Sequence, residues 1–245
     1  TLGTDDYIRI YVSNGGTLAA GSGTLSAANV LLNDNTVIGG KLIAGKVSTN
    51  GSVSNQGTLI AQSLEIASGT LTNTGTLGDA SSRLNILAGG TLVASGHERF
   101  SSLATFGDGV GTWRGELRNS SAVAPGDNGN FGTLLVDGNY RQTETGLLQI
   151  DLSGTGNDRL GVTGNASFNG TLVLHQTGTD PLTSFVPVQV VDAASYSGNF
   201  SSLSEDLDGA VWFNPGNGSV ILMSSGGGVS PQFSASTGNQ VSTWV

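Results

Sequence analysis

Residues 40–77 read GKLIAGKVSTNGSVSNQGTLIAQSLEIASGTLTNTGTL, a stretch in which glycine and leucine recur at nearly constant spacing. Leu25, Leu42 and Leu59 follow one another at equal intervals, and the interval from Leu59 to Leu77 is almost the same. Leu92, in another copy of the same unit, follows Leu77 after a slightly shorter interval. A short strand that recurs at a fixed period is typical of a solenoid, in which each repeat forms one turn and stacks on the next.

The same Gly-Thr-Leu unit extends well beyond this stretch. It occurs at 16–18, 23–25, 57–59, 69–71, 75–77, 90–92, 132–134 and 170–172, with variants at 40–42 and 115–117. A solenoid of stacked repeats offers a long surface rather than one deep pocket. We therefore expect a protein that spans a distance, adheres to a surface or stacks with other molecules.

The composition favours an all-β fold. The 245 residues include 39 glycines and 5 prolines, 37% are hydrophobic and only 11% are charged. Disordered chains combine low hydrophobicity with high charge, and collagen needs glycine at every third position, so both classes are excluded. No segment shows an apolar period of about 3.6 residues between helix caps.

Strand-like runs alternate with turn residues, and their spacing allows two or three short strands per turn. The runs are 7–12, 29–32, 41–44, 63–66, 83–87 and 91–94. We predict a right-handed parallel β-helix, because an antiparallel sandwich has no need of a fixed period. In the sandwich interpretation, Asn50-Gly51 would close a two-residue hairpin. A left-handed helix of three hexapeptides per turn is a further alternative, although no strict six-residue pattern is visible.

Aromatic side chains divide the chain. Residues 1–96 contain only Tyr7 and Tyr11, whereas every Phe and Trp lies at Phe100 or later. We predict β-helix turns over 1–123, C-terminal turns and a cap over 124–223, and a Gly/Ser linker with a polar tail over 224–245. The last turn of a solenoid exposes its apolar interior and unpaired strand edges. We therefore expect the aromatic part, including Trp212 and Phe213, to form the cap.

Several short motifs between Ala124 and about residue 200 carry a resemblance to a known family. They are Ala124-Pro125-Gly126, Gly132-Thr133-Leu134-Leu135-Val136, Gly138-Asn139-Tyr140-Arg141-Gln142, Leu148-Gln149-Ile150-Asp151-Leu152, residues 157–166 and Gly170-Thr171-Leu172. Together they resemble the C-terminal passenger region, or autochaperone region, of bacterial autotransporter-type surface proteins. The resemblance implies the last turns of a β-helix, a secreted or outer-surface location, and folding that begins at the C-terminal end. We assign structural roles to Tyr140, Asp158, Arg159 and Leu160 within it.

The two ends of the sequence lead to an expectation about its origin. It begins at Thr1 without a start methionine or signal peptide, so we expect a processed piece of a longer protein. It stops at Val245 before any membrane anchor. The anchor is then expected elsewhere in the parent chain, or the parent is a related surface protein with another kind of anchor.

Charge and cysteine content restrict the partners. The net charge is −9, which repels the phosphate backbone of nucleic acids and argues against contact with anionic membrane surfaces, so we expect no nucleic-acid binding. No apolar run approaches about 18 residues, so we expect no direct membrane insertion. The absence of cysteine excludes disulfides and thiolate metal sites. The expected partners are a host or bacterial surface protein, a glycan, or another copy of the chain.

Two patterns that could hold a metal are better explained as structure. Residues 154–160 are similar to a calcium-binding nonapeptide turn, but such sites need tandem copies and only one is present. Asp158 is therefore expected to bond nearby backbone N–H groups. His97 and His175 are the only histidines, and no spaced cluster of ligands or marked serine nucleophile accompanies them. We expect no metal, no cofactor and no enzymatic activity.

Paired carboxylates could indicate a glycosidase or lyase, and alternating threonines could indicate an ice-binding surface. The positions of these residues in the sequence argue against both functions. Asp5 and Asp6 are adjacent on a predicted strand and would point to opposite faces. Glu205, Asp206 and Asp208 fall in a polar loop. The alternating threonines, which would suggest a flat ice-binding array, are interrupted by a corner at Asn73 and Gly75; they are Thr70, Thr72, Thr74 and Thr76.

The sequence thus predicts a structural or adhesive segment of a bacterial surface β-helix, whose C-terminal part folds and caps it. One alternative is a polysaccharide-binding or polysaccharide-degrading β-helix of the tailspike kind, in which Trp113 and Trp212 would contact the glycan. Another is a self-assembling extracellular fibre subunit that would use residues 229–245 to dock on a neighbouring copy.

Overall fold

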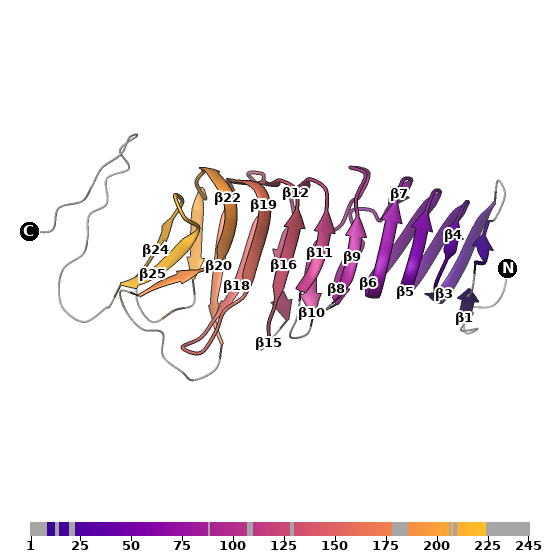
Figure 1. Ribbon diagram of the computed structural model, residues 1–245, viewed down its shortest axis with the longest axis horizontal. Coiled ribbons are helices and arrows are strands. Elements are labelled where there is room, and N and C mark those ends of the chain that lie inside the picture. Colours follow the sequence, from indigo (N-terminus) through magenta and orange to yellow (C-terminus); the bar gives the residue numbers. More distant parts are fainter. Residues whose placement is uncertain are drawn as a thin grey trace, which may run out of the picture.

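The computed structural model describes residues 9–12, 15–19, 23–87, 89–106, 110–127, 130–177, 186–205, 207 and 210–223. In these residues the chain forms a parallel β-solenoid of about eight turns without a helix. The turns succeed one another along one long axis, from β1 near the N-terminus to β24 and β25 near the C-terminus (Figure 1). The predicted all-β parallel solenoid is confirmed, and its handedness stays a prediction.

Each full turn contributes a strand to three parallel sheets, which form the three faces of the solenoid. The first sheet contains β1 (Arg9–Val12), the second half of β3 (Thr24–Leu32), the middle of β5 (Lys41–Asn55), the middle of β6 (Thr58–Asn73), β8 (Arg83–Leu87), β10 (Ser102–Phe106), β13 (Ala122–Ala124), β18 (Leu147–Leu152), β20 (Thr171–Gln176) and β23 (Ser202–Glu205).

The other two sheets follow the first around the turn. The second contains β2 (Thr17–Leu18), β4 (Thr36–Ile38), the ends of β5 and β6, β9 (Gly90–Val93), β11 (Val110–Arg114), β16 (Thr133–Asp137) and the beginnings of β19 (Arg159–Phe168) and β22 (Val191–Gly198). The third contains the beginnings of β3, β5 and β6, then β7 (Thr76–Leu77), β12 (Leu117–Asn119), β17 (Tyr140–Gln142) and the ends of β19 and β22.

The corners of the turns are bends in continuous strands rather than hairpins. Asn50-Gly51, the hairpin candidate, lies inside β5 and pairs in parallel with Ser68 and Gly69 of β6. Gly51 has a φ of 90°, a conformation that glycine adopts without steric cost, and the register shifts just before Asn50. The hairpin interpretation is therefore wrong, because this turn residue bends the strand into the next sheet.

The register of the leucines corrects one predicted interval. Leu25, Leu42, Leu59 and Leu77 stack directly on one another in the third sheet, as their spacing predicts. Leu92, however, stacks on Leu71 in the second sheet and not on Leu77. The Gly-Thr-Leu unit marks the entrance of a strand after a corner, and because each turn has three corners the unit occurs in different sheets.

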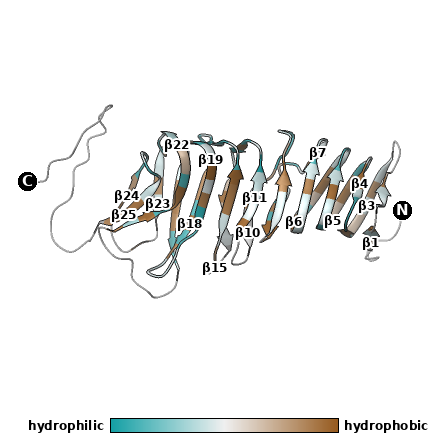
Figure 2. Ribbon diagram, in the orientation of Figure 1, coloured by the Kyte–Doolittle hydropathy of each residue, from teal (hydrophilic) through white to brown (hydrophobic). Residues whose placement is uncertain are grey.

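Inward side chains of the strands form one continuous apolar core. In β5, Leu42, Ala44, Val47 and Val53 are buried while their neighbours point outward, which is the alternation expected of a strand with one covered face. Figure 2 shows hydrophobic stretches along the strands throughout the stack.

The turns lengthen toward the C-terminus. In the first sheet Val30 stacks on Val47 near the start of the chain, and Leu172 stacks on Leu203 near its end. The stretch of chain between stacked partners nearly doubles from the first of these pairs to the second. The longer turns are found where the aromatic residues are.

Two short antiparallel elements interrupt the parallel pattern. β14 (Gly126–Asp127) pairs with β15 (Asn130–Phe131) at a corner. Near the C-terminus, β21 (Pro187–Gln189), β25 (Ser219–Met223) and β24 (Ala210–Asn214) form a three-stranded sheet. β13 crosses the predicted domain boundary at residue 123, and parallel pairing continues on both sides of it. No helix in the described residues is long and apolar enough to cross a membrane.

Candidate functional site

The antiparallel sheet at the C-terminal end carries an aromatic cluster. Phe213 of β24 packs edge-on against Phe168 at 5.3 Å and Phe200 at 4.8 Å, and these two rings lie 4.8 Å apart. Tyr196 also stacks on Phe168. Offset and edge-to-face ring pairs contribute about 0.5–1.5 kcal/mol each beyond the area they bury. Phe213, which the sequence predicts to belong to the cap, is only 8% exposed because its ring packs against this aromatic cluster near the C-terminal end of the solenoid.

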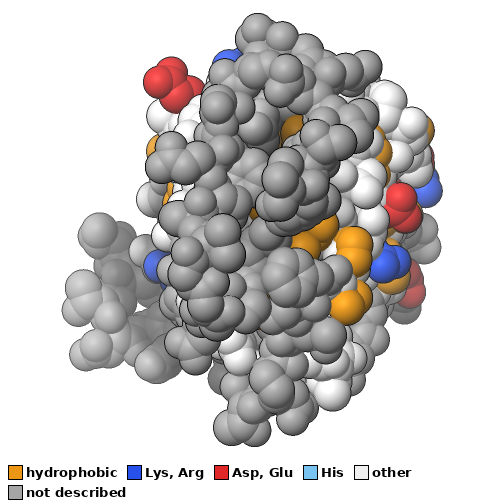
Figure 3. All heavy atoms as spheres, turned by 90° about the vertical axis from the view of Figure 1, so that its left-hand side faces the viewer, with side chains coloured by type: hydrophobic (Ala, Val, Ile, Leu, Met, Phe, Trp, Pro, Cys, Tyr) orange, Lys and Arg blue, Asp and Glu red, His pale blue; other side chains and the backbone are white. Residues whose placement is uncertain are grey.

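Trp212, the second residue predicted for the cap, lies on the opposite face of the same strand. Its side chain is 38% exposed because successive residues of a strand point to opposite sides. Figure 3 views the molecule from the C-terminal end, where a group of hydrophobic side chains reaches the surface. The side chain of Trp212 is therefore partly accessible to a ligand.

Trp113, the other predicted glycan contact, points into the solenoid. It is 5% exposed, and it stacks between Leu92 and Val136 of the neighbouring turns of the second sheet. Its Nε1 donates a hydrogen bond of 3.3 Å to the backbone oxygen of Glu116. Since almost no ring surface remains open, the predicted contact between tryptophan and glycan rests on Trp212.

Tyr140 is at the centre of a buried polar network. Its hydroxyl donates to Oε1 of Gln142 at 2.5 Å and accepts from Nδ2 of Asn119 at 2.9 Å. The two amides in turn bond backbone oxygens of Gly146, Leu147 and Thr171, which ties three turns together. Burial raises the pKa of Tyr140 above its ordinary value, and the Asn119 hydrogen bond opposes this only in part.

Asp158 closes the connection between β18 and β19. It is buried, and its two carboxylate oxygens accept hydrogen bonds of 2.9 Å from the backbone N–H groups of Gly132 and Asp151. Leu160 is also buried and stacks on Leu134 and Val191, whereas the side chain of Arg159 is exposed. Both carboxylate oxygens of Asp158 thus accept hydrogen bonds from backbone N–H groups, as expected of a residue that holds a corner of the chain in place.

Among the residues that the structure describes, those considered for metal binding or catalysis do not come together. Among the described residues no group of three or more His, Asp or Glu side chains could hold a metal ion. His97 is exposed, with its Nδ1 3.4 Å from the Ser95 hydroxyl, and His175 lies in the first sheet, in register with Asp151 of the neighbouring strand. Asp5, Asp6, Asp206, Asp208, the side chain of Glu205 and residues 224–245 lie outside the described residues.

Threonines form one short outward column. Thr70, Thr91 and Thr112 are stacked in the second sheet on three successive turns. The neighbouring column, which starts at Thr72, continues with Val93 and Arg114 instead. β6 ends at Asn73, so Thr74 and Thr76 lie beyond the corner, where the sequence places it. The two regular columns that a flat threonine array needs are therefore not formed.

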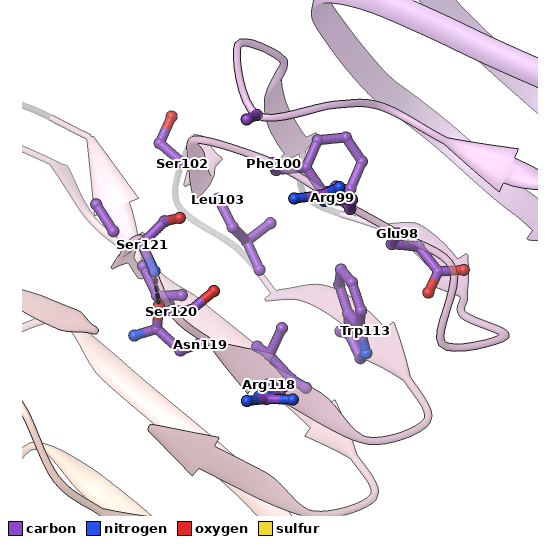
Figure 4. Close-up of a pocket in the computed structure, with 14 residues that line it drawn as sticks. Glu98, Arg99, Phe100, Ser102, Leu103, Trp113, Arg118, Asn119, Ser120 and Ser121 are labelled. Carbon is purple, nitrogen blue, oxygen red and sulfur yellow. Dashed lines mark hydrogen bonds between the residues drawn. The ribbon is translucent and has the colours of Figure 1, made fainter. Parts of the chain in front are cut away.

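A partly open cavity of about 170 Å³ lies at an interruption of the third sheet (Figure 4). Leu77 forms a parallel bridge with Glu98 on one side, and β12 pairs with β17 on the other. Within the part of the chain that the structure describes, no bridge joins the Glu98 turn to β12. The cavity lies between these two turns. Its larger apolar lining residues include Phe100, Leu103, Trp113 and Leu117, and its polar lining comes from Glu98, Arg99, Ser102, Arg118, Asn119, Ser120 and Ser121.

Arginines follow one another beside this cavity. Arg99 and Arg118 border it from the two neighbouring turns, and Arg118 is paired in register with Arg141 of the turn after. All three side chains are exposed, and among the described residues none forms an ion pair. The nearby Arg114 differs, because its Nε lies 3.1 Å from Asp137. We call Arg99, Arg118 and Arg141 the arginine column.

Sequence reasoning missed the arginine column although a signal was present. The three arginines recur at intervals close to one turn of the solenoid in this region, as the register of Arg118 with Arg141 shows. Arginine is rare in this chain, since Lys and Arg together number nine. A repeat of one charged residue type at turn spacing therefore indicates a column on one face. No comparable pattern in the sequence predicts the cavity, whose lining residues come from several separate segments of the chain.

No protein-family model matches this chain, and a comparison with curated proteins finds no match either. The fold is compatible with a β-helix passenger, and it supports the resemblance to that extent.

Proposed function

We propose that this chain is a structural and adhesive segment of a bacterial cell-surface or secreted protein. The solenoid serves as a rigid, elongated scaffold, and its C-terminal part serves as the folding and capping unit. The scaffold has no catalytic role of its own. Its expected partners are glycans or surface proteins outside the cell.

The closure of the C-terminal end carries this proposal. The first parallel sheet is continuous from β1 to β23, and the C-terminal end of the chain adds the antiparallel sheet of β21, β25 and β24. β24 places Phe213 on Phe168 of β19 and on Phe200, so the last turns are covered by aromatic side chains. Stacked repeats need such a cap, because each turn is stabilised mainly by its neighbours. Large ring surfaces supply more burial per residue than the aliphatic turns before them.

Two complementary truncations test the capping role. The chain is divided after β13 into residues 1–124 and residues 125–245, and thermal unfolding of each piece is followed by circular dichroism. We expect residues 125–245 to unfold cooperatively on their own and residues 1–124 to lose cooperative unfolding. Residues 1–124 with the same transition temperature as the corresponding turns of the intact chain would refute the folding and capping role.

A polysaccharide-binding role is favoured by the exposed ring of Trp212. Substitution of Trp212 by alanine is expected to weaken retention on an immobilised glycan array while the chain still unfolds cooperatively, with only a small change in melting temperature. Unchanged retention of every glycan that binds the wild type would remove this support.

A further inference from the structure

The arginine column places positive charge on one face of a molecule whose net charge is negative. The chain carries a net charge of −9, yet three of its nine basic residues lie on consecutive turns of one face. Neighbouring strands of a sheet are about 4.8 Å apart. Arg118 and Arg141 are register partners, and like charges directly opposite each other on adjacent strands destabilise the sheet. Arg99 borders the same cavity from the turn on the other side of the interruption. An arrangement of this kind is relieved when an anion binds across it.

The local carboxylates do not supply that anion. Glu98 faces the same cavity, but its Oε1 accepts hydrogen bonds from Nδ2 of Asn73 at 2.6 Å and from the backbone of Ser95 at 2.7 Å. Asp137 is paired with Arg114. Glu116 precedes β12 and Glu144 follows β17, and within the described residues neither forms an ion pair with the column. The three guanidinium groups are therefore available to an external ligand.

The cavity beside the column indicates what else the ligand contains. Serine hydroxyls at its rim can bond sugar hydroxyls; the serines are Ser102, Ser120 and Ser121. Leu103, Trp113 and Leu117 are buried, so the half-buried Phe100 is the large apolar lining residue that a sugar unit can contact. Its volume of about 170 Å³ is smaller than the roughly 300–1,000 Å³ of pockets that enclose a drug-sized molecule. It therefore accommodates one unit of a longer ligand whose other units continue along the solenoid.

We propose that the arginine column and the adjoining cavity bind an acidic polysaccharide. Its carboxylate or sulfate groups pair with Arg99, Arg118 and Arg141, and one of its sugar units enters the cavity. Planar guanidinium groups bind carboxylate and sulfate oxygens through two parallel hydrogen bonds. The inference rests on the proposed adhesive role in one respect, because it names the ligand of that role.

A nucleic acid fits this surface less well than a glycan does. Dense phosphate charge is repelled by a molecule of net charge −9. Single strands also need exposed aromatic rings on which bases stack, and Trp113, the tryptophan at this cavity, is buried. An acidic polysaccharide offers hydroxyl groups to the serines, and one with a single carboxylate on each sugar unit carries fewer charges along its length than duplex DNA does.

The test measures binding of the full chain to immobilised polygalacturonate, dextran sulfate, neutral dextran and duplex DNA at physiological ionic strength. The variant Arg118→Gln/Arg141→Gln removes two charges from the column. Arg83→Gln/Arg159→Gln is the matched control, since it removes two exposed arginines from the other two sheets. We expect the column variant to bind at least one acidic polysaccharide about a hundredfold more weakly, roughly tenfold for each arginine that loses its charged hydrogen bonds.

The outcomes separate the possible ligands. Loss of binding to polygalacturonate assigns carboxylates, and loss of binding to dextran sulfate alone assigns sulfates; both support the site. Equal weakening in the control variant, equal binding to neutral dextran, or tighter binding to DNA would overturn it. A wild-type chain that melts cooperatively but binds neither acidic polymer would also overturn it, while the scaffold and capping role, tested by truncation, would stand.

Discussion

At the scale of single residues, the close approach of successive turns limits what a corner can hold. Gly69 has a φ of 74°, and a Cβ placed on it would collide with the backbone oxygen of Gly51 in the turn before. Real Cβ atoms do not approach oxygen so closely, so a larger residue must push two turns apart. Glycine at this corner is thus required both by conformation and by space.

Gly89 offers a matched control for that statement. Its φ is 82°, similar to that of Gly69, but no atom lies within 4 Å of a Cβ built on it. Gly89→Ala should cost about 1–2 kcal/mol, the strain of alanine in the left-handed region. Gly69→Ala should cost about 2 kcal/mol more because it also overpacks the corner. Denaturant unfolding measures both, and equal losses would show that the turns are not stacked this tightly.

We expect the chain to lose stability at alkaline pH because Tyr140 is buried. Burial raises its pKa, so the folded chain keeps the phenolic proton when the unfolded chain releases it above about pH 10. The unfolded state then binds fewer protons, and the free energy of unfolding falls as pH rises, by at most about 1.4 kcal/mol per pH unit. This contribution is complete below about pH 10 and is lost progressively above it.

Tyr140→Phe isolates this effect. At neutral pH the variant should be about 1–2 kcal/mol less stable, because Asn119 and Gln142 lose a buried partner. Above about pH 10 the difference between wild type and variant should shrink, since phenylalanine does not titrate. Urea unfolding across this range checks it, and a difference that stays constant with pH would contradict the burial of a neutral Tyr140 hydroxyl.

At the scale of strands and sheets, the cap depends on one face of β24. Phe213 packs against Phe168 and Phe200, while its neighbour Trp212 remains 38% exposed. Phe213→Ala should lower the free energy of unfolding by about 3 kcal/mol, as expected for a buried ring, and Trp212→Ala by less than about 1 kcal/mol. If thermal melting shows the larger effect for Trp212→Ala, the aromatic cluster does not cap the solenoid.

The same scale shows why the sequence predicts some elements and not others. Leu25, Leu42, Leu59 and Leu77 stack as predicted, because the early turns are short and nearly equal in length. Leu92 lies in a different stack from the one that its spacing suggests, since Gly-Thr-Leu marks any of three corners and its period is not unique to one sheet. The later turns are longer, so the spacing of residues along the sequence does not predict which residues are paired there.

The candidate sites are harder to predict than the fold. The sequence leaves the direction of Trp113 undecided, because period-two alternation in a strand assigns a face only once the register is known, and the ring points inward. The arginine column needs the same register to become visible. Within the described residues no backbone pairing joins the two turns that border the cavity, and no pattern of residues in the sequence predicts this.

At the scale of the whole molecule, the central claim is the order in which the turns stack. The chain contains no cysteine, so engineered pairs of cysteines form the only possible disulfides. Thr70 and Thr91 are register partners on adjacent strands of the second sheet, and strands about 4.8 Å apart suit the Cα separation of a disulfide. Equal spacing of the Gly-Thr-Leu units would instead place Thr91 beside Thr76.

The most direct measurement compares disulfide formation in Thr70→Cys/Thr91→Cys and in Thr76→Cys/Thr91→Cys, under mild oxidation of dilute protein. Electrophoresis without reductant separates the linked chains from the open ones. The observed stacking predicts rapid and complete linkage of the first pair and none of the second. Linkage of the second pair without the first would contradict the three-sheet solenoid described above.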